Sequence, residues 1–279
     1  MKKIVCLLLA LTLAFGLVAC GKGETPAGEQ GENGAPAVSI KKTVLVDESD
    51  VKITALEFVE NTLIGPEVKL EIRNKSDKDL VFQVREAIVN NYMVNGVMSV
   101  EVAAGEEART SILFSATDLR DCGITTVASI DLSFRAFDAK NWSVHLNSKL
   151  ASLTTSAAEG FQYTYNHEGA VLHAENGVKI IAKDPIKQGG VNIYIYNGSE
   201  SSITVQSVKC ALDGIEIDAQ FYEDLPMGKH MVAELIIPEE ILEENGLAVL
   251  TQITLSFEIL NSNGEQVAQT AETTLNVQQ

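Results

Sequence analysis

The sequence predicts an all-β protein built from two tandem β-sandwiches, each with one short helix. Two observations support this prediction. Apolar residues alternate with polar residues over short segments, which is typical of strands that bury one face. The chain also repeats itself, because Ile130-Asp-Leu-Ser-Phe134 recurs as Ile253-Thr-Leu-Ser-Phe257, 123 positions later.

The internal repeat covers a whole domain. Residues 68–76 match residues 191–199 at the same offset of 123, and they share an Asn-x-Ser ending. Residues 51–53 recur at an offset of 127 as residues 178–180, so the first copy has a longer turn between Glu57 and Glu67. A period of this length is too long for a solenoid repeat, and it indicates a duplicated domain.

Each copy contains the same predicted strands. Alternating residues that we expect to face the cores are Val68, Leu70, Ile72, Ile130, Leu132 and Phe134 in the first copy and Val191, Ile193, Ile195, Ile253, Leu255 and Phe257 in the second. Tyr194 and Tyr196 are expected on the opposite face of their strand. Asn95-Gly96 and Asp213-Gly214 are typical hairpin turns, and strands at this spacing favour a sandwich.

One helical turn interrupts the strands of each copy. It is expected at residues 115–123 and again at residues 238–246, where the sequence reads Pro-Glu-Glu-Ile-Leu-Glu-Glu-Asn-Gly. Pro238 fits the first helical position and Gly246 fits the position after the end. Leu119 and Leu242 are expected to anchor the two helices. The glutamates of the second helix are interpreted as a solvated face.

The N-terminus has the parts of an export signal. Lys2 and Lys3 are followed by an uncharged run from Ile4 to Val18. This run has fifteen residues, whereas a helix needs about 20 to span a bilayer core. We therefore predict a signal peptide over residues 1–19 rather than a permanent transmembrane helix.

The end of this signal resembles the bacterial lipobox in Leu17, Val18, Ala19 and Cys20. The resemblance implies that Cys20 receives a diacylglyceryl group and that the chain is cut before it, which gives a lipid-anchored, acylated (palmitate-type) lipoprotein. Two acyl chains suffice for stable anchoring. The expected location is the outer face of a bacterial cell membrane, with membrane lipid as one partner. The alternative is an ordinary cleaved signal with a chance cysteine.

The chain after the signal divides into three parts. Residues 20–37 have the Gly-, Pro- and Glu-rich composition of a flexible tether. Residues 38–155 form the first predicted sandwich, here repeat 1, and residues 156–279 form the second, here repeat 2. Repeat 1 has a formal charge of −4 and repeat 2 one of −13. This acidic balance argues against a nucleic-acid partner, and it favours either solubility alone or attraction of cations or a basic partner.

The lipobox, the tether and the strand–helix–Gly–(Ile-x-Leu-x-Phe) pattern together resemble the immunoglobulin-like modules of Gram-positive lipoproteins of unassigned function. The resemblance implies an immunoglobulin-like sandwich and no active-site motif. The antibody-type Cys-Trp-Cys core is absent, since Cys122 and Cys210 lie in different copies. Each of these cysteines is expected to be a small buried residue, although a bridge between them is open to an exported protein. The aromatic residues Phe161, Tyr163 and Tyr165 are expected to pack at the domain junction or to form a first strand.

The sequence contains no constellation that indicates an enzyme. His-x-x-x-His, Cys-x-x-Cys, Gly-x-Ser-x-Gly and phosphate-loop motifs are all missing. The tyrosines also lack the Tyr-x-x-x-Tyr spacing of haem-binding immunoglobulin-like modules. We therefore expect no catalytic residues and no cofactor.

Two weaker features remain. Asp47, Glu48 and Asp50 group three carboxylates before a strand and are weak candidates for a calcium site, although a solvated turn is favoured. Trp142 is predicted in or just after a hairpin turn that begins at Asp138. It is a possible contact residue for a partner, while packing onto its own domain is the more ordinary alternative.

The sequence therefore favours a membrane-anchored, extracytoplasmic binding, interaction or structural module at the cell envelope. Its partner would be another envelope protein, a polymer or a host surface. The alternative is a small-molecule or cation-binding lipoprotein, such as a transporter-associated capture protein. Most such capture proteins have two α/β lobes, and the alternating strand and helix patterns of those lobes are absent here.

Overall fold

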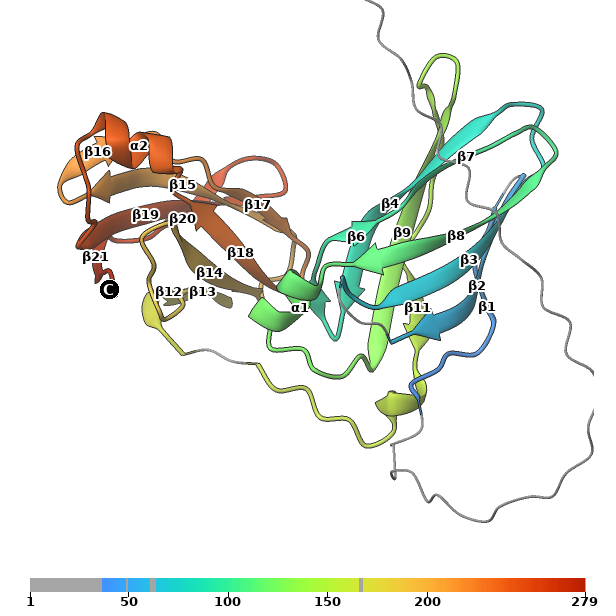
Figure 1. The fold of residues 1–279 in the computed structure, drawn as a ribbon, viewed down its shortest axis with the longest axis horizontal. Coiled ribbons are helices and arrows are strands. Elements are labelled where there is room, and N and C mark those ends of the chain that lie inside the picture. Colours follow the sequence, from blue (N-terminus) through green and yellow to red (C-terminus); the bar gives the residue numbers. More distant parts are fainter. Residues whose placement is uncertain (1–36, 49, 61–63, 166–167, 279) are drawn as a thin grey trace, which may run out of the picture. The chain divides into compact units, whose positions relative to one another are not determined.

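Each repeat folds into two packed antiparallel sheets, in a computed structural model that describes residues 37–48, 50–60, 64–165 and 168–278 (Figure 1). The two tandem sandwiches predicted from the sequence are thus confirmed. The elements of repeat 1 are β1 (Thr43–Glu48), β2 (Val51–Val59), β3 (Glu67–Asn74), β4 (Leu80–Val89), β5 (Tyr92–Met93), β6 (Gly96–Val97), β7 (Ser99–Val102), β8 (Glu107–Phe114), α1 (Ala116–Asp121), β9 (Ser129–Asp138), β10 (Val144–Asn147) and β11 (Ala151–Thr154).

Repeat 2 opens with a single 3-10 turn and then follows the same order. Its elements are η1 (Ser156–Ala158), β12 (Ala170–Glu175), β13 (Val178–Ala182), β14 (Gly190–Asn197), β15 (Ile203–Leu212), β16 (Ile215–Ile217), β17 (Tyr222–Leu225), β18 (His230–Ile236), α2 (Glu239–Glu244), β19 (Gln252–Asn261), β20 (Gln266–Gln269) and β21 (Thr273–Asn276). None of the helices in the described residues is long and apolar enough to cross a membrane.

The strand order is immunoglobulin-like in both repeats. In repeat 1, β2, β3 and β8 form one sheet, extended by β1 and β6 at its edges. The other sheet places β4 between β7 and β9, and β9 also pairs with β10 and β11. The first, second and fifth main strands therefore share one sheet, and the third, fourth, sixth and seventh share the other. The constant-type immunoglobulin fold differs in placing its fourth strand in the first of these sheets.

Equivalent elements of the repeats keep the spacing seen in the sequence. β12 begins 127 residues after β1, and β14, β15, β17, β18, α2 and β19 each begin 123 residues after their counterparts. Irregularities are equivalent too, since the ladder with the neighbouring strand shifts between Val84 and Glu86 in β4 and between Ser207 and Lys209 in β15. The backbone of repeat 1 is thus reproduced in repeat 2 down to a β-bulge.

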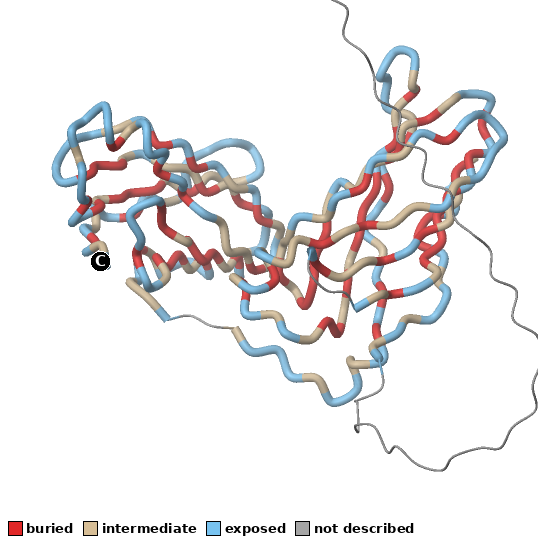
Figure 2. The backbone as a smooth tube through the Cα atoms, in the orientation of Figure 1, coloured by how far each residue is buried: buried red, intermediate tan, exposed pale blue. Residues whose placement is uncertain are grey.

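The two cores lie between the paired sheets of each sandwich, where buried residues run along the facing strands (Figure 2). Every alternating residue named in the sequence analysis is fully buried: Val68, Leu70, Ile72, Ile130, Leu132, Phe134, Val191, Ile193, Ile195, Ile253, Leu255 and Phe257. One face of each strand therefore builds a core, as the period-two pattern predicts.

The two short helices form where the sequence predicts them. Ser115 caps α1 by accepting a hydrogen bond from the Asp118 backbone N–H, and Gly246 follows α2 in the left-handed conformation. Leu119 and Leu242 are the buried residues that anchor the helices. Pro238 is the N-cap of α2 rather than its first helical residue. Its φ of −61° and ψ of 142° leave it in an extended conformation that leads into the helix.

One predicted turn is wrong and one was missed. Gly96 begins the edge strand β6 instead of closing a hairpin. The chain reverses at Asn90-Asn91, where both residues have positive φ angles of 48° and 71°. This is the conformation of a two-residue hairpin turn, which Asn tolerates better than most residues. Its counterpart in repeat 2 is Asp213-Gly214, the turn that the sequence did predict.

A short parallel strand pair connects the two repeats. Tyr92 and Met93 of β5 pair with His230 and Met231 of β18, so that sheets from both repeats become one ten-stranded sheet. The register is fixed by the Asn90-Asn91 turn, because the backbone N–H of His230 donates to the Asn91 carbonyl. This connection places the end of β4 beside repeat 2, and the candidate site lies there.

Candidate functional site

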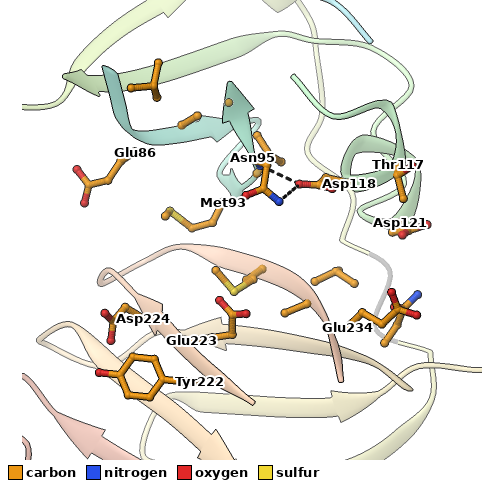
Figure 3. Close-up of a pocket in the computed structure, with 18 of the residues that line it drawn as sticks. Glu86, Met93, Asn95, Thr117, Asp118, Asp121, Tyr222, Glu223, Asp224 and Glu234 are labelled. Carbon is orange, nitrogen blue, oxygen red and sulfur yellow. Dashed lines mark hydrogen bonds between the residues drawn. The ribbon is translucent and has the colours of Figure 1, made fainter. Parts of the chain in front are cut away.

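A groove of about 750 Å³ lies along the β5–β18 connection and is lined by residues of both repeats (Figure 3). Its floor includes apolar residues of both repeats, Ala87, Met93 and Val94 from repeat 1 and Met231, Val232 and Ala233 from repeat 2. A second hollow of about 640 Å³ shares Arg85, Glu86, Met93, Tyr222 and Asp224 with it and continues past β17. The volume is within the range of ligand-binding sites.

The floor of the groove includes an open strand edge. The N–H of Ile237 donates to Gly189 on the β14 side. Along an antiparallel strand the backbone N–H and C=O groups of successive residues point to opposite sides. The backbone groups of Glu234 and Ile236 therefore point away from β14 and toward the groove. Among the described residues no strand pairs with this edge beyond Met231, since the N–H of Val94 bonds back to Ala87. The edge is therefore available for pairing with an added chain.

Carboxylates surround this floor. Glu86, Asp118 and Asp121 come from repeat 1, and Glu223, Asp224 and Glu234 come from repeat 2, while Arg85 is the basic residue of the lining. The groove thus brings together negatively charged side chains that are far apart in the sequence. Such a surface attracts cationic groups over several ångströms.

Some of these carboxylates have partners that fix them in place. Asp118 accepts hydrogen bonds from the backbone N–H and side-chain amide of Asn95, at 2.8 and 2.7 Å (Figure 3). Glu86 accepts from the Ser133 hydroxyl at 2.6 Å and from Arg85 at 3.0 Å. These contacts hold the repeat 1 wall in one conformation.

The Glu223 and Glu234 side chains make no hydrogen bond or ion pair within the part of the chain that the structure describes. Glu223 is half-buried, and burial, with a smaller contribution from Asp224, raises the pKa of its carboxyl above the ordinary value. A partly desolvated carboxylate without a counter-ion is costly. A cationic group in the groove would therefore interact most strongly at Glu223.

Polar contacts join the two repeats at the junction beside the groove. Lys229 donates to the Asn91 side chain at 2.8 Å and pairs with Asp131 at 3.3 Å, and the Asn91 amide donates to the Gly228 carbonyl at 2.9 Å. Lys229 and Asp131 side chains are each 19% exposed. These bonds join the turn of repeat 1 to the loop before β18.

An aromatic cluster seals the same junction. His230 stacks on Tyr165 and on Tyr196, and its Nδ1 is 2.7 Å from the Tyr194 hydroxyl. Tyr194 is fully buried, although strand alternation predicted the outer face. The reason is that Tyr92 of repeat 1 covers this face of β14. Of the three aromatics before β12, Tyr165 packs at the junction, and residues 161–165 form no strand.

The acidic turn that was a weak calcium candidate does not form a cluster. Asp47 pairs with Lys52 at 3.1 Å, and Asp50 is 3.1 Å from the His145 ring nitrogen. Glu48 is exposed at the end of β1. Among the described residues, no group of three or more His, Cys, Asp or Glu side chains is placed to hold a metal ion.

Trp142 lies at the end of the β9–β10 turn, in repeat 1 and away from the groove lining. Its side chain is 61% exposed, and its ring contacts Phe137 with the centroids 6.1 Å apart. Its φ angle is 58°, a conformation that bulky residues seldom adopt. The structure thus leaves most of the side chain free to meet a partner.

The remaining cysteines are free and buried in separate places. Burial raises the pKa of Cys122 to about 12 and that of Cys210 to about 11. Cys122 ends helix α1 against the junction, and Cys210 lies in the repeat 2 core. The structure therefore contains no bridge between them. Leu17, Val18, Ala19 and Cys20 of the predicted anchor lie outside the described residues.

Sequence reasoning did not find the groove. Its six carboxylates come from four separate elements, β4, α1, β17 and β18, and acidic residues on such elements look like ordinary surface residues. One signal in the sequence was useful. The repeat alignment places Asn90-Asn91 opposite the turn Asp213-Gly214, and it therefore indicates a turn at Asn90-Asn91 too. In the structure the turn of repeat 2 is exposed to solvent, whereas that of repeat 1 lies at the junction. The partners of that turn in space could not be read from the alignment.

The fold and the groove define a class of protein, a tandem immunoglobulin-like sandwich with an acidic cleft at the junction. No family model matches the chain, and no curated protein matches it in sequence. Solved structures give only distant similarity. A chain of the Salmonella enterica SafA pilin–SafB chaperone complex has a TM-score of 0.25 and 10% identity, covering 82% of this chain and 98% of that chain. The YadV chaperone has a TM-score of 0.25 and 11% identity, covering 82% of this chain and all of that chain. Red sea bream transglutaminase has a TM-score of 0.23 and 10% identity, covering 84% of this chain and 32% of that chain. Similarity at this level supports no statement about function.

Proposed function

We propose that this protein is a binding module of the cell envelope, anchored through Cys20, whose groove takes an extended, positively charged segment of a partner protein. The observation that carries the proposal is the combination of an open β18 edge with the unpaired carboxylates of Glu223 and Glu234 beside it. An added strand would pair its backbone with β18, and its lysine or arginine side chains would meet the acidic walls. This is recognition by strand addition. The proposal contains no catalytic step.

The apolar residues of the floor set a second requirement for the sequence of the partner segment. Side chains alternate along a strand, so a bound segment would direct one face to Met93 and Met231 and the other to the carboxylates. We therefore expect a partner segment in which basic and aliphatic residues alternate. Charge attraction would speed its association, and the effect would weaken as salt is added.

Titration of the full chain in detergent with a peptide of about ten alternating Lys and Val residues tests this proposal. We expect saturable binding that weakens at least about tenfold in a Glu223→Gln/Glu234→Gln variant, since losing the two charge contacts together should cost about 1.4 kcal/mol or more. Glu243→Gln/Glu244→Gln, on the exposed face of α2, is the matched control. A peptide with Glu in place of Lys should not bind.

Three outcomes would count against the proposal. Binding that is equal for the Lys and Glu peptides would remove the electrostatic argument. Binding that persists unchanged in the double variant would place the site elsewhere. Saturable calcium binding that needs Glu223 and excludes the Lys peptide would favour the cation-binding alternative instead.

A further inference from the structure

The outer face of the β9–β4 sheet in repeat 1 has a strip of apolar side chains that ends at Trp142. Phe137 lies at its centre and is paired in register with Val81 on one side and with Val144 on the other. Trp142 contacts Phe137 at the turn, and Val144 is 58% exposed. We call these four residues, Val81, Phe137, Trp142 and Val144, the apolar strip.

A row of polar side chains lies beside the strip on the same face, two residues further along β4 and β9. Arg135 is placed with its guanidinium carbon 5.3 Å from the centre of the Phe137 ring, and its Nε donates to the Gln83 side chain at 3.0 Å. Gln83 faces Ser99 across the next pair, and Asn147 faces Arg135 on the other side. The row offers planar amide and guanidinium groups with fixed directions.

Repeat 2 is an internal control for this face because it has the same strands in the same register. Leu260 stands where repeat 1 has Phe137, and it pairs with Thr204 where repeat 1 has Val81. Glu258 replaces Arg135, and it pairs with Gln206. The strip is therefore specific to repeat 1 and is not a requirement of the fold.

The turn between β9 and β10 in repeat 1 also differs from the equivalent turn between β19 and β20 in repeat 2. The N–H of Asp138 closes the loop of repeat 1 onto Ser143, and the N–H of Asn261 closes that of repeat 2 onto Glu265. The residue just before each closing residue has a positive φ, 78° at Gly264 and 58° at Trp142. Repeat 1 thus holds its only tryptophan in a conformation for which repeat 2 uses glycine. Strained residues of this kind concentrate at binding sites.

Hydrogen bonds within the loop hold the Trp142 backbone in place. Its backbone N–H donates to the Asp138 carbonyl at 2.8 Å, and the Asp138 carboxyl accepts from the Lys140 N–H at 2.9 Å. The Asn141 side chain accepts from the Ser143 N–H at 2.9 Å. A fixed ring loses little conformational entropy when a ligand covers it.

We propose that this face of repeat 1 binds a neutral polysaccharide chain. The exposed ring of Trp142, supported by the half-buried ring of Phe137, would pack against the C–H faces of sugar rings, and Arg135, Gln83 and Asn147 would exchange hydrogen bonds with the hydroxyls. The one cation of the row, Arg135, is matched by Glu101, which pairs with Val81 at the other end of the strip. The charge balance fits an uncharged ligand. A strip one side chain wide also suits a single glycan chain better than a protein surface, which needs a broad apolar patch.

Fluorescence of the full chain in detergent tests this proposal directly, because Trp142 is the only tryptophan. The probes are soluble oligosaccharides of β-linked glucose and of β-linked N-acetylglucosamine, and a soluble α-glucan. At least one should shift the emission to shorter wavelength and protect the indole from acrylamide, with saturation. Protection by none of them overturns the proposal. Protection that depends on protein concentration without saccharide would overturn it too, since the strip would then be a contact between copies.

Variants taken from repeat 2 separate binding from folding. Trp142→Gly and Phe137→Leu should each weaken binding, measured by titration calorimetry, by about tenfold. Trp142→Phe, which keeps a ring, should retain most of it. Val267→Ala, on the exposed strand β20 of repeat 2, should bind like the wild type. Wild-type affinity in Trp142→Gly, with a folded protein, would refute the assignment.

Discussion

Asn74 and Asn197 are buried side chains that hold the same turn in the two sandwiches, 123 positions apart. The amide of Asn74 donates to the carbonyls of Lys78 and Val102, at 2.7 and 2.9 Å. The amide of Asn197 donates to those of Ser201 and Leu225, at 2.8 and 2.9 Å. In each repeat the Asn oxygen also accepts from the serine two residues later, Ser76 or Ser199.

Replacing either asparagine with alanine should destabilise the protein. Each change removes two amide hydrogen bonds and the oxygen that accepts from the neighbouring serine, which costs about 2 kcal/mol. Urea unfolding of Asn74→Ala and Asn197→Ala should show similar losses, since the environments match. Asn263→Ala, at an exposed turn, is the control and should change little. A large difference between the two buried variants would contradict the equivalence of the turns.

Lys229→Met should loosen the junction between the repeats. The change removes the bonds to Asn91 and Asp131 while keeping an unbranched side chain only one atom shorter. Because the pair is partly buried, we expect a loss of about 1–2 kcal/mol. Amide hydrogen exchange should rise at residues 90–93 and in β18, but not in the two cores. Unchanged exchange there would show that the aromatic cluster alone holds the junction.

Glu223→Gln should stabilise the protein near neutral pH. Burial raises the pKa of Glu223 in the folded state, with Asp224 adding to the effect. The folded state therefore favours the protonated form, and the stability from this group is lost as pH rises through the raised pKa. The variant should melt higher than the wild type at about pH 7 and equally at a pH below the ordinary range of Glu. Glu243→Gln, on the exposed helix α2, should show no such trend.

Cys122 and Cys210 should react slowly with thiol reagents in the folded protein. Burial raises their pKa values to about 12 and about 11, so little thiolate exists at about pH 8. Labelling should become fast in urea, with both thiols titrating. A protein that shows no thiol even after unfolding would indicate a disulfide and contradict the separate burial of the two residues.

Cys20→Ala should abolish lipid attachment if the lipobox resemblance holds. The variant would appear in the soluble fraction or remain as an uncut precursor, because the acyl chains supply the membrane affinity. Fractionation with mass analysis of the N-terminus checks this prediction. Membrane association equal to that of the wild type would exclude lipidation at this residue as the anchor.

Most of the sandwich architecture could be predicted from the sequence, because it depends on patterns among residues that are close together in the chain. Val68, Leu70 and Ile72 alternate because one face of β3 is buried, and Gly246 ends α2 because its backbone is left-handed. The prediction failed for Tyr194, because Tyr92 of the other repeat covers the face of β14 on which Tyr194 lies. It failed also at Asn95-Gly96, where a common turn pair begins an edge strand instead.

The sequence by itself determined the two-sandwich fold, the internal repeat and the position of Trp142 at a turn. Those features depend on the period of apolar residues and on turn chemistry, which act over a few neighbouring positions. Only the tertiary structure decided that Glu86, Asp118, Glu223 and Glu234 line one groove and that Trp142 extends an apolar strip. These groupings join residues that are far apart along the chain. They depend on the register of β5 against β18 and of β9 against β10, which no local pattern specifies.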